Sequence, residues 1–240
     1  MAVSGSSDGR QERWRQHNLE RRRRIIEAAV AVIEESGAGA EVHVQQIAER
    51  AGLSRSVVYR HFEDRADLDR AVQEAIVEDI ASRLLPSVNL QGTGPEIVAR
   101  IVGTYVAWAG AHPALHRAAD HETDDLSGPL EKALEEIASH VSTVIGAAIL
   151  ALGAEPTDED SASLDPLVYG LVGAVFGSVR RWLHRPERVL SEERLTQLVS
   201  QSVWFVIAGH ASTLGLAVGP DQRLDELAAM AGLGDLAAPA

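Results

Sequence analysis

Residues 43–62 of the chain read HVQQIAERAGLSRSVVYRHF, and their apolar and turn residues are spaced as in a helix-turn-helix. Gly52 can adopt the left-handed conformation that ends a helix, and the hydroxyl of Ser54 can cap the helix that follows. The buried sides of the two helices are predicted to be formed by Val44, Ile47, Ala48 and Ala51, and then by Val58 and Phe62. The stretch therefore predicts two short helices joined by a sharp turn.

The outer side of the second predicted helix is rich in hydrogen-bond donors. It carries Arg55, Ser56, Val57, Tyr59, Arg60 and His61. The major groove of DNA, about 12 Å wide, admits an α-helix. Arg55 and Arg60 are candidates for bidentate contacts with guanine, and Val57 for packing on a thymine methyl group. Alternatively, the two arginines bind phosphates, which positions a protein without reading sequence.

Around this stretch the chain resembles the TetR family of one-component transcriptional regulators. The resemblance rests on the spacing IA-x-x-AG-x-S-x-x-x-x-Y-x-x-F, with IIEAAVAVIEESG before it at 25–37 and EDRADLDRAV after it at 63–72. It implies an all-α fold, with an N-terminal three-helix DNA-binding domain and a C-terminal helical domain for ligand binding and dimerisation. It also implies a sequence-specific regulator, most often a repressor that a small, largely apolar effector releases from its operator on double-stranded DNA.

Several residue roles follow from the resemblance. His43 stands where the family usually has a threonine that contacts phosphate, and Arg65 where it commonly has a lysine. Tyr59 and His61 match positions that usually hold the DNA backbone. Together with the outer side of the second helix and the arginines before the first, the expected DNA-binding residues are Arg22, Arg23, Arg24, His43, Val44, Gln45, Ser54, Arg55, Ser56, Val57, Tyr59, Arg60, His61 and Arg65.

The net charge of −13 over 240 residues is unusual for a DNA-binding protein, but it is unevenly distributed. Residues 10–60 contain ten Arg and seven acidic residues, a net charge of +3, so the remainder carries −16. Basic charge is therefore concentrated in the predicted DNA-binding domain. The acidic remainder of the chain is expected to keep away from the duplex. Only Lys132 among the 22 basic residues is a lysine, a bias that matches codon usage as well as chosen guanidinium chemistry.

We expect four segments along the chain. Residues 1–17 form a disordered Arg-containing arm, 18–66 the helix-turn-helix domain, 67–218 the ligand-binding and dimerisation domain, and 219–240 a C-terminal tail. Residues 86–95 have the composition of a linker. Helices of the body are predicted at about 95–111, 113–121, 127–152, 159–184 and 191–215.

Location is predicted from composition. The absence of cysteine excludes disulfide and thiolate chemistry and fits the cytoplasm. No membrane segment is expected, since the apolar run at 141–154 is short of the roughly 20 residues that span a bilayer. The stretch 195–220 lacks charged residues, but it contains several polar ones, so burial between subunits explains it better.

A homodimer is expected from the body. Gly170, Gly173 and Gly177 lie within one predicted helix, where each costs about 1 kcal/mol relative to alanine. Close approach of two backbones would offset that cost, and TetR-like proteins pair their last two long helices into a four-helix dimer interface. Trp182, Trp204 and Phe205 are expected there. An isologous dimer matches a palindromic operator.

The effector is expected inside the body, where the candidate pocket residues are Tyr105, Trp108, His112, Tyr169 and Phe176. The alternative is that these are ordinary core residues. His112 and His116, with Asp120 and His121 nearby, have helical metal-ligand spacing, but Pro113 interrupts the helix between them. We therefore expect neither a metal nor a cofactor beyond the unknown effector.

No sequence motif points to catalysis, since nucleophile-elbow, phosphate-loop and paired-carboxylate patterns are missing. The prediction is a DNA-binding regulator and not an enzyme. A helical small-molecule-binding or scaffold protein that does not act through DNA is the alternative.

Overall fold

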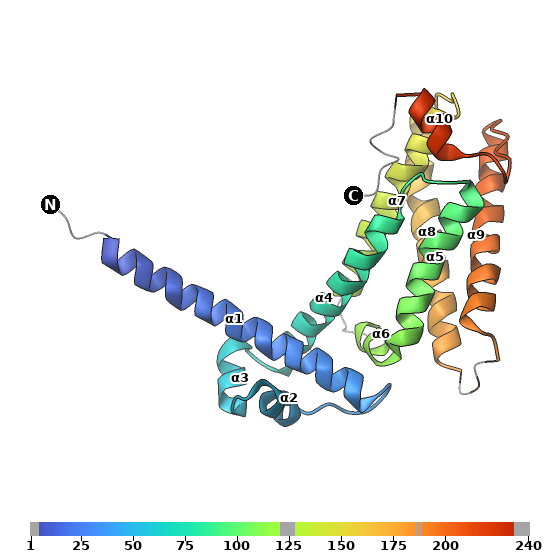
Figure 1. Cartoon of the computed structure of the whole chain (residues 1–240). Coiled ribbons are helices and arrows are strands. Elements are labelled where there is room, and N and C mark those ends of the chain that lie inside the picture. Colours follow the sequence, from blue (N-terminus) through green and yellow to red (C-terminus); the bar gives the residue numbers. More distant parts are fainter. Residues whose placement is uncertain (1–4, 121–127, 186, 188, 233–240) are drawn as a thin grey trace. The chain divides into compact units, whose positions relative to one another are not determined.

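The computed structural model describes residues 5–120, 128–185, 187 and 189–232, and within these ranges the chain forms helices and no strand (Figure 1). The predicted all-α class is confirmed. The chain divides into two compact units. The first comprises residues 1–76 and 113–124, and the second comprises residues 77–112 and 125–240.

The first unit is a helix-turn-helix with added helices. It contains α1 (Gly5–Ser36), α2 (Val44–Ala51), α3 (Arg55–His61), the first part of α4 (Arg65–Leu84) and α6 (Pro113–Ala119). The helix α1 packs against α2, α3 and α6. One fully buried side chain from each of α1 to α4, with the residue that ends α3, builds the core: Ile25, Ile47, Val58, Phe62 and Leu68.

The turn between α2 and α3 has the predicted geometry. Gly52 ends α2 in the left-handed conformation, with φ 66° and ψ 36°. The N–H of Leu53 returns to the carbonyl of Ala48 at 2.9 Å. Ser54 has the extended backbone of a cap, but its hydroxyl lies 2.9 Å from that of Ser56 and does not accept from an α3 amide. The expected side-chain cap is therefore wrong, although the helix begins where expected.

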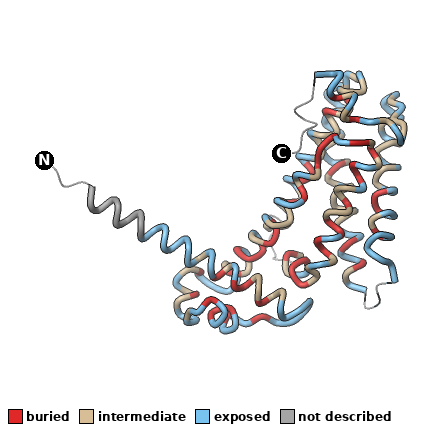
Figure 2. Tube along the Cα trace, in the orientation of Figure 1, coloured by how far each residue is buried: buried red, intermediate tan, exposed pale blue. Residues whose placement is uncertain are grey.

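The helix α1 begins at Gly5, whereas residues 1–17 were expected to be a disordered arm. Residues 10–24 contain neither Gly nor Pro and are mostly Arg, Gln and Glu, which favour helix. An ion pair at helical spacing, 3.4 Å between Arg23 and Glu27, adds support at the junction with the packed part of α1. Residues 14–20 are exposed, as the pale blue stretch of α1 shows in Figure 2.

The second unit is a bundle of long helices. It contains the second part of α4, the short 3-10 helix η1 (Leu85–Ser87), α5 (Gly94–Ala111), α7 (Pro129–Ala151), α8 (Asp158–Leu183), α9 (Glu192–Thr213) and α10 (Leu224–Met230). α5 packs on α9, and α7 on α8. The hydroxyls of Thr93, Thr157 and Ser191 accept amides at 3.1–3.4 Å and fix where α5, α8 and α9 begin.

The stretch predicted as a linker is held in place. Val88, Asn89 and Leu90 are buried. The guanidinium of Arg100 donates to the carbonyls of Ser87 at 3.0 Å, Asn89 at 3.0 Å and Gln91 at 2.8 Å. Residues 86–93 are therefore a fixed part of the second unit.

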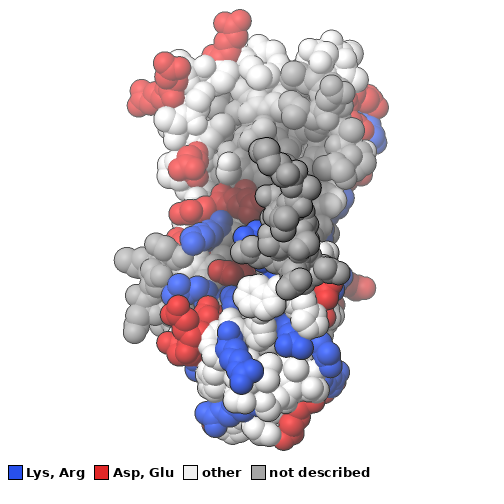
Figure 3. All heavy atoms as spheres, turned by 90° about the vertical axis from the view of Figure 1, so that its left-hand side faces the viewer, with Lys and Arg blue, Asp and Glu red and all other residues white. Residues whose placement is uncertain are grey.

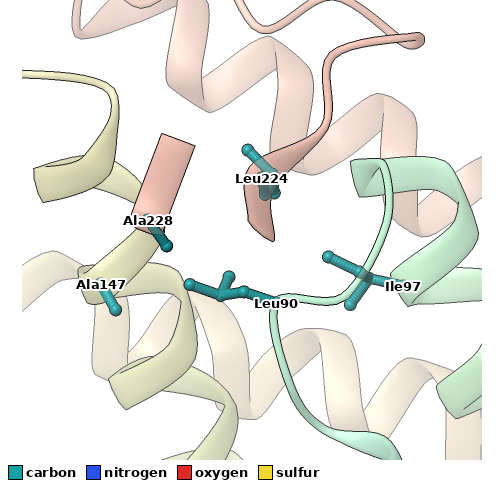
Figure 4. Close-up of a cluster of buried hydrophobic side chains, with 5 residues drawn as sticks. All are labelled: Leu90, Ile97, Ala147, Leu224 and Ala228. Carbon is teal, nitrogen blue, oxygen red and sulfur yellow. The ribbon is translucent and has the colours of Figure 1, made fainter. Parts of the chain in front are cut away.

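The stretch predicted as a C-terminal tail contains α10, which packs on α7. Leu224 and Ala228 are buried, and the N–H of Leu224 donates to the carbonyl of Gly92 at 2.9 Å. Figure 4 shows both side chains beside Leu90, Ile97 and Ala147. The second unit thus extends beyond the expected boundary at residue 218.

By length and composition alone, α7 and α8 would be able to cross a membrane. Core helices of proteins that never enter a bilayer have the same properties, so this is weak evidence, and it does not indicate a membrane protein.

Candidate nucleic-acid interface and effector cavity

The outer side of α3 presents the residues that the sequence predicted. Arg55, Ser56 and Arg60 are exposed, while Val57, Tyr59 and His61 are half-buried. The guanidinium carbon of Arg55 lies 5.5 Å from the centre of the Tyr59 ring, which orients that side chain along the helix. On the opposite side, Val58 is fully buried. α3 therefore offers hydrogen-bond donors outward from a fixed base.

The start of α2 adds a second group of predicted residues. The N–H of His43 donates to Gln46 Oε1 at 2.7 Å, and its ring Nδ1 lies 3.6 Å from a carboxylate oxygen of Glu41. Gln45 is exposed and donates to Glu49 at 2.7 Å. The side chain of Val44 is 7% exposed, so it packs in the core. What Val44 can offer a ligand is its amide, in the first helical turn, where N–H groups lack partners within the helix.

Two of the predicted phosphate contacts are engaged within the protein. Arg22 donates from Nη1 to the carbonyl of His61 at 2.8 Å, and its guanidinium lies 4.2 Å above the Phe62 ring. Arg65 pairs with Asp69 at 2.7 Å and donates to the carbonyl of Val42 at 2.7 Å. Arg22 therefore ties α1 to the end of α3, and Arg65 ties α4 to the loop before α2.

The other basic side chains of α1 that the structure describes, among them Arg15, Arg21, Arg23 and Arg24, are exposed. Arg23 pairs with Glu27, and a Cβ added at Gly52 would lie 3.0 Å from Nη2 of Arg24, so Arg24 reaches the turn after α2. Burial, followed by the positive charges of Arg21 and Arg22, lowers the pKa of His61 below its ordinary value. In the face shown in Figure 3, most of the basic side chains lie in the lower part of the picture, with acidic side chains and uncharged surface between them.

The second unit contains an apolar cavity of about 140 Å³ that is partly open. Its walls come from the 86–93 segment, from α5, α7, α8 and α9, and from residues after α9, and they include Leu90, Ile97, Val144, Leu167, Trp204 and Leu224. Among the described residues that line it, His210 is the single titratable one. A Cβ built on Gly94 would lie 2.1 Å from the Trp204 ring, so this glycine makes room for the indole.

None of the five predicted pocket residues lines this cavity. Tyr105 and Phe176 stack with ring centres 6.4 Å apart, and Trp108 donates from Nε1 to Asp79 at 3.0 Å. The His112 ring lies 5.5 Å from that of Trp108. A hydrogen bond from Tyr169 to Glu131, followed by burial, raises the pKa of Tyr169 to about 12. These aromatics make contacts within the second unit, and their role in effector binding stays a prediction, whereas this cavity is lined mainly by aliphatic residues that no sequence pattern distinguishes from core.

Two of the three predicted dimer contacts point into their own subunit. Trp182 is buried and donates from Nε1 to the carbonyl of Leu190 at 2.9 Å, and Trp204 lines the cavity. Only Phe205 projects outward, with 63% of its surface exposed. His116 is buried, and His121 lies outside the described residues. Within the described part of the chain, no group of three potential metal ligands is found.

The outer side of α8 carries small residues, and that of α9 carries large exposed apolar ones. A Cβ added at Gly170, Gly173 or Gly177 would meet nothing within 4 Å. On α9, Leu198, Phe205 and Val206 are exposed. Only 11% of the most apolar part of α8 is buried.

Comparison with known proteins gives a family match for the helix-turn-helix segment and relatives that cover most of the chain. Residues 25–72 match the family model of bacterial regulatory proteins of the tetR family. The chain is 24% identical over 209 residues to the uncharacterised HTH-type transcriptional regulator Rv0472c of Mycobacterium tuberculosis, with 87% of this chain and 86% of that protein covered. It is 24% identical over 194 residues to the nucleoid occlusion factor SlmA of Marinomonas sp., covering 79% and 93%.

Solved structures share the fold. A tetR-family transcriptional regulator from Streptomyces coelicolor aligns with a TM-score of 0.62 and 21% identity, over 89% of this chain and 98% of that one. The transcriptional regulator FadR from Bacillus subtilis, solved in complex with stearoyl-CoA, aligns with a TM-score of 0.55 and 18% identity, over 77% and 96%.

The matched segment contains α2, the turn at Gly52 and α3, whose outer side carries the donors described above. Regulators of this kind bind DNA and are not enzymes. Residues 25–72 thus match the DNA-binding segment of the tetR family of bacterial regulatory proteins, and over most of its length the chain is similar to an HTH-type transcriptional regulator and shares the fold of a tetR-family regulator.

Proposed function

We propose that the protein is a homodimeric repressor that binds a palindromic operator through α3 and leaves it when a small, largely apolar effector fills the cavity of the second unit. The observation that carries the proposal is the outer side of α3, where Arg55 and Arg60 stand exposed on a helix whose other side is fully buried at Val58. Such a helix fits the major groove, and exposed arginines are the commonest readers of guanine.

The DNA contacts divide by their surroundings. Arg55 and Arg60 are proposed to read bases, with Val57 against a thymine methyl. Exposed or half-buried polar groups are proposed to hold phosphates, namely Arg23, Arg24, His43, Gln45, Ser54, Ser56, Tyr59 and His61, with the amide of Val44. Arg22 and Arg65 are proposed to act mainly by holding the helices of the DNA-binding unit in place, since their guanidinium groups already bind main-chain carbonyls.

A second copy of the chain is proposed to cover the outer side of α8 and α9. Small residues on α8 allow close approach of a partner helix, and the exposed Phe205 supplies an aromatic anchor. Two readers related by a two-fold axis then meet half-sites one turn of DNA apart, about 34–36 Å. The dimer is expected to act in the cytoplasm, where its DNA lies.

Release from DNA requires a coupling free energy between effector binding in the cavity and DNA binding by the first unit. For a near-complete switch, the effector must prefer the DNA-free conformation by a factor of about 10⁴. The relative FadR was solved with stearoyl-CoA, which shows that an acyl ligand can be accommodated by this fold. We propose the aliphatic cavity as the corresponding site here, and not the predicted aromatic set.

The test is selection of bound sequences from a random duplex pool, followed by affinity measurements on the selected sequence over a salt series. Recovery of a palindrome, with affinity that falls steeply as salt rises, is expected. Arg60→Ala should relax the preference at one position of each half-site. Arg50→Ala removes the same charge from an exposed pair with Glu35 and serves as the control.

Failure of the selection would count against a DNA role if it persists after the protein is unfolded and refolded without bound ligand. In that case the alternative, a helical small-molecule-binding or scaffold protein, would be favoured.

A further inference from the structure

The chemistry of the cavity lining restricts the kind of ligand that it can hold. The described lining residues are aliphatic apart from Trp204 and His210, and His210 is exposed at the edge. No carboxylate or guanidinium faces inward among them. Burying a charge without a partner is strongly unfavourable, and burying an unpaired hydroxyl is unfavourable as well. The interior is therefore suited to uncharged hydrophobic groups.

The volume sets an upper size. The cavity measures about 140 Å³, and an engineered protein cavity of about 150 Å³ with Leu, Ile and Phe walls stays dry and binds benzene. One aromatic ring, or an aliphatic group of similar bulk, thus fills the space without rearrangement of the walls. A longer chain would need a wall to move.

One wall is attached differently from the others. α5, α7, α8 and α9 are helices of 18 to 26 residues, whereas the remaining wall is the stretch that holds Leu216, Val218 and Leu224 and leads into the seven-residue α10. Its main-chain attachments include the hydrogen bond from Leu216 to Ala211 at 3.0 Å, at the end of α9, and the hydrogen bond from Leu224 to Gly92 at 2.9 Å, next to an isolated bridge between Thr93 and Arg223.

The surface that this wall rests on is held more firmly. Arg100 fixes the 86–93 segment through three carbonyls, and the Thr93–Glu96 capping pair, 2.8 Å from the Thr93 N–H to Glu96 Oε2, anchors its end. In Figure 4, Leu224 and Ala228 of the short C-terminal helix lie in one cluster with Leu90 and Ala147. Short segments with few main-chain bonds open at lower free energy than long packed helices.

We propose that the cavity binds an uncharged hydrophobic molecule with the bulk of about one aromatic ring, and that residues 214–230 form the wall that moves to widen its opening. This deepens the proposed function, since it rests on this cavity being the effector site, and it names the class of effector and its entrance.

The ligand class is tested by direct binding to the full-length protein without DNA. The probes are toluene, butylbenzene and benzoate, with calorimetry for affinity and tryptophan emission as the signal from Trp204. Toluene should bind, whereas butylbenzene and benzoate should bind at least about tenfold more weakly, a difference of about 1.4 kcal/mol. Equal binding of benzoate, or no binding of toluene, would overturn the proposal.

Filling the cavity locates the binding site. Ala211→Phe and, on a different wall, Ala148→Leu should each remove toluene binding if the variant unfolds cooperatively. Ala229→Phe adds the same bulk as the first variant on the exposed side of α10 and is expected to bind toluene normally. Retained binding in both cavity variants would place the probe elsewhere and reject the assignment.

The entrance is tested with a removable lock. Because the chain has no cysteine, Thr93→Cys with Arg223→Cys introduces only one possible disulfide, between residues already paired across an antiparallel bridge. With para-fluorotoluene and fluorine NMR, oxidation should slow both entry and exit by about tenfold or more while leaving the dissociation constant within about twofold. Reduction of the same sample should restore the rates, and this controls for the loss of the Thr93 cap. Unchanged exchange rates in the locked protein would show that residues 214–230 are not the entrance.

The same samples separate this proposal from the proposed function. If toluene binds in the cavity but does not weaken operator binding, the effector role fails and the ligand class stands. If toluene does not bind and operator binding remains intact, the ligand class fails and the DNA role stands.

Discussion

Arg22 and Arg60 are both arginines of the first unit, yet their surroundings predict different roles, one in stability and one in DNA recognition. Arg60 is exposed on the outer side of α3, while Arg22 binds the carbonyl of His61 and covers the Phe62 ring. Arg60→Ala should leave the thermal midpoint unchanged and reduce base discrimination by about 1–3 kcal/mol at one position. Arg22→Ala should lower the free energy of unfolding by about 1–2 kcal/mol, because a charged hydrogen bond and a ring contact are lost.

Thermal unfolding and binding to an operator panel check both substitutions. Equal losses of stability in the two variants would contradict the division of roles.

The pKa of His61 gives DNA binding a predicted pH dependence. Burial, then Arg21 and Arg22, hold this pKa below its ordinary value, so the free protein has a neutral imidazole at neutral pH. A nearby phosphate favours the charged form and should raise the pKa in the complex. Affinity should then rise as pH falls through the raised pKa, and level off below the depressed pKa of the free protein.

The contribution of His61 to folding stability depends on pH with the opposite sign from its contribution to DNA affinity. Because the folded state disfavours the imidazolium, this group reduces stability as pH falls from the ordinary histidine pKa towards the lowered one. Affinity measured across pH at constant ionic strength should have a smaller slope in His61→Gln. An unaltered slope in that variant would exclude His61 as the group that takes up the proton.

Residue periodicity predicted which side of α3 faces outward, since Val58 and Phe62 had to be buried four positions apart. It did not predict that Arg22 would bind the carbonyl of His61, 39 positions along the chain. Such a pair depends on how α1 crosses α3, which no local pattern encodes. The Arg65–Asp69 ion pair could be predicted from the sequence, because the two residues are four positions apart on a helix.

At the scale of elements, the contact between α5 and α9 at Gly94 makes a testable demand. A Cβ there would lie 2.1 Å from the Trp204 ring, so Gly94→Ala must displace the indole. Overpacking of this kind costs about 1–3 kcal/mol, and we expect lower stability with a change in tryptophan emission. Gly146→Ala on α7 is the matched control, because its added methyl meets no atom within 4 Å. That variant should be more stable by about 0.5–1 kcal/mol.

Denaturant unfolding of both variants is the measurement. Stabilisation by Gly94→Ala would mean that the indole moves without cost and that the glycine has no packing role.

The body helices were predictable as elements because caps and prolines mark their ends, as Thr93, Thr157 and Pro113 do. The attachment of α10 was not, since seven residues with mild amphipathicity differ little from a tail. The cavity was also out of reach of the sequence. Leucine, isoleucine and valine have the same pattern whether the space between them is filled or empty, so the sequence favoured aromatic residues, which do not line this cavity.

At the scale of the whole molecule, the proposed dimer depends on the outer side of α8 and α9. Phe205→Glu places a charge where the partner would pack, and should shift the protein from dimer to monomer at micromolar concentration. The monomer should bind a half-site about as well as the full palindrome. Met230→Glu alters an equally apolar and 76% exposed position on α10 and is expected to remain dimeric.

Sedimentation analysis of both variants decides the matter. A dimeric Phe205→Glu protein that still binds the palindrome would move the interface to another surface.

The chain passes between its two units three times, and α6 belongs to the first unit although α5 before it and α7 after it belong to the second. During synthesis the DNA-reading unit therefore cannot complete its core until α6 has been made, after α5. α5 in turn waits for α9, which ends roughly 100 residues later, on the order of 5–20 s at typical rates of translation. Translation thus produces segments of the two units in alternation. A fragment that ends before residue 113 lacks α6, which packs on α1.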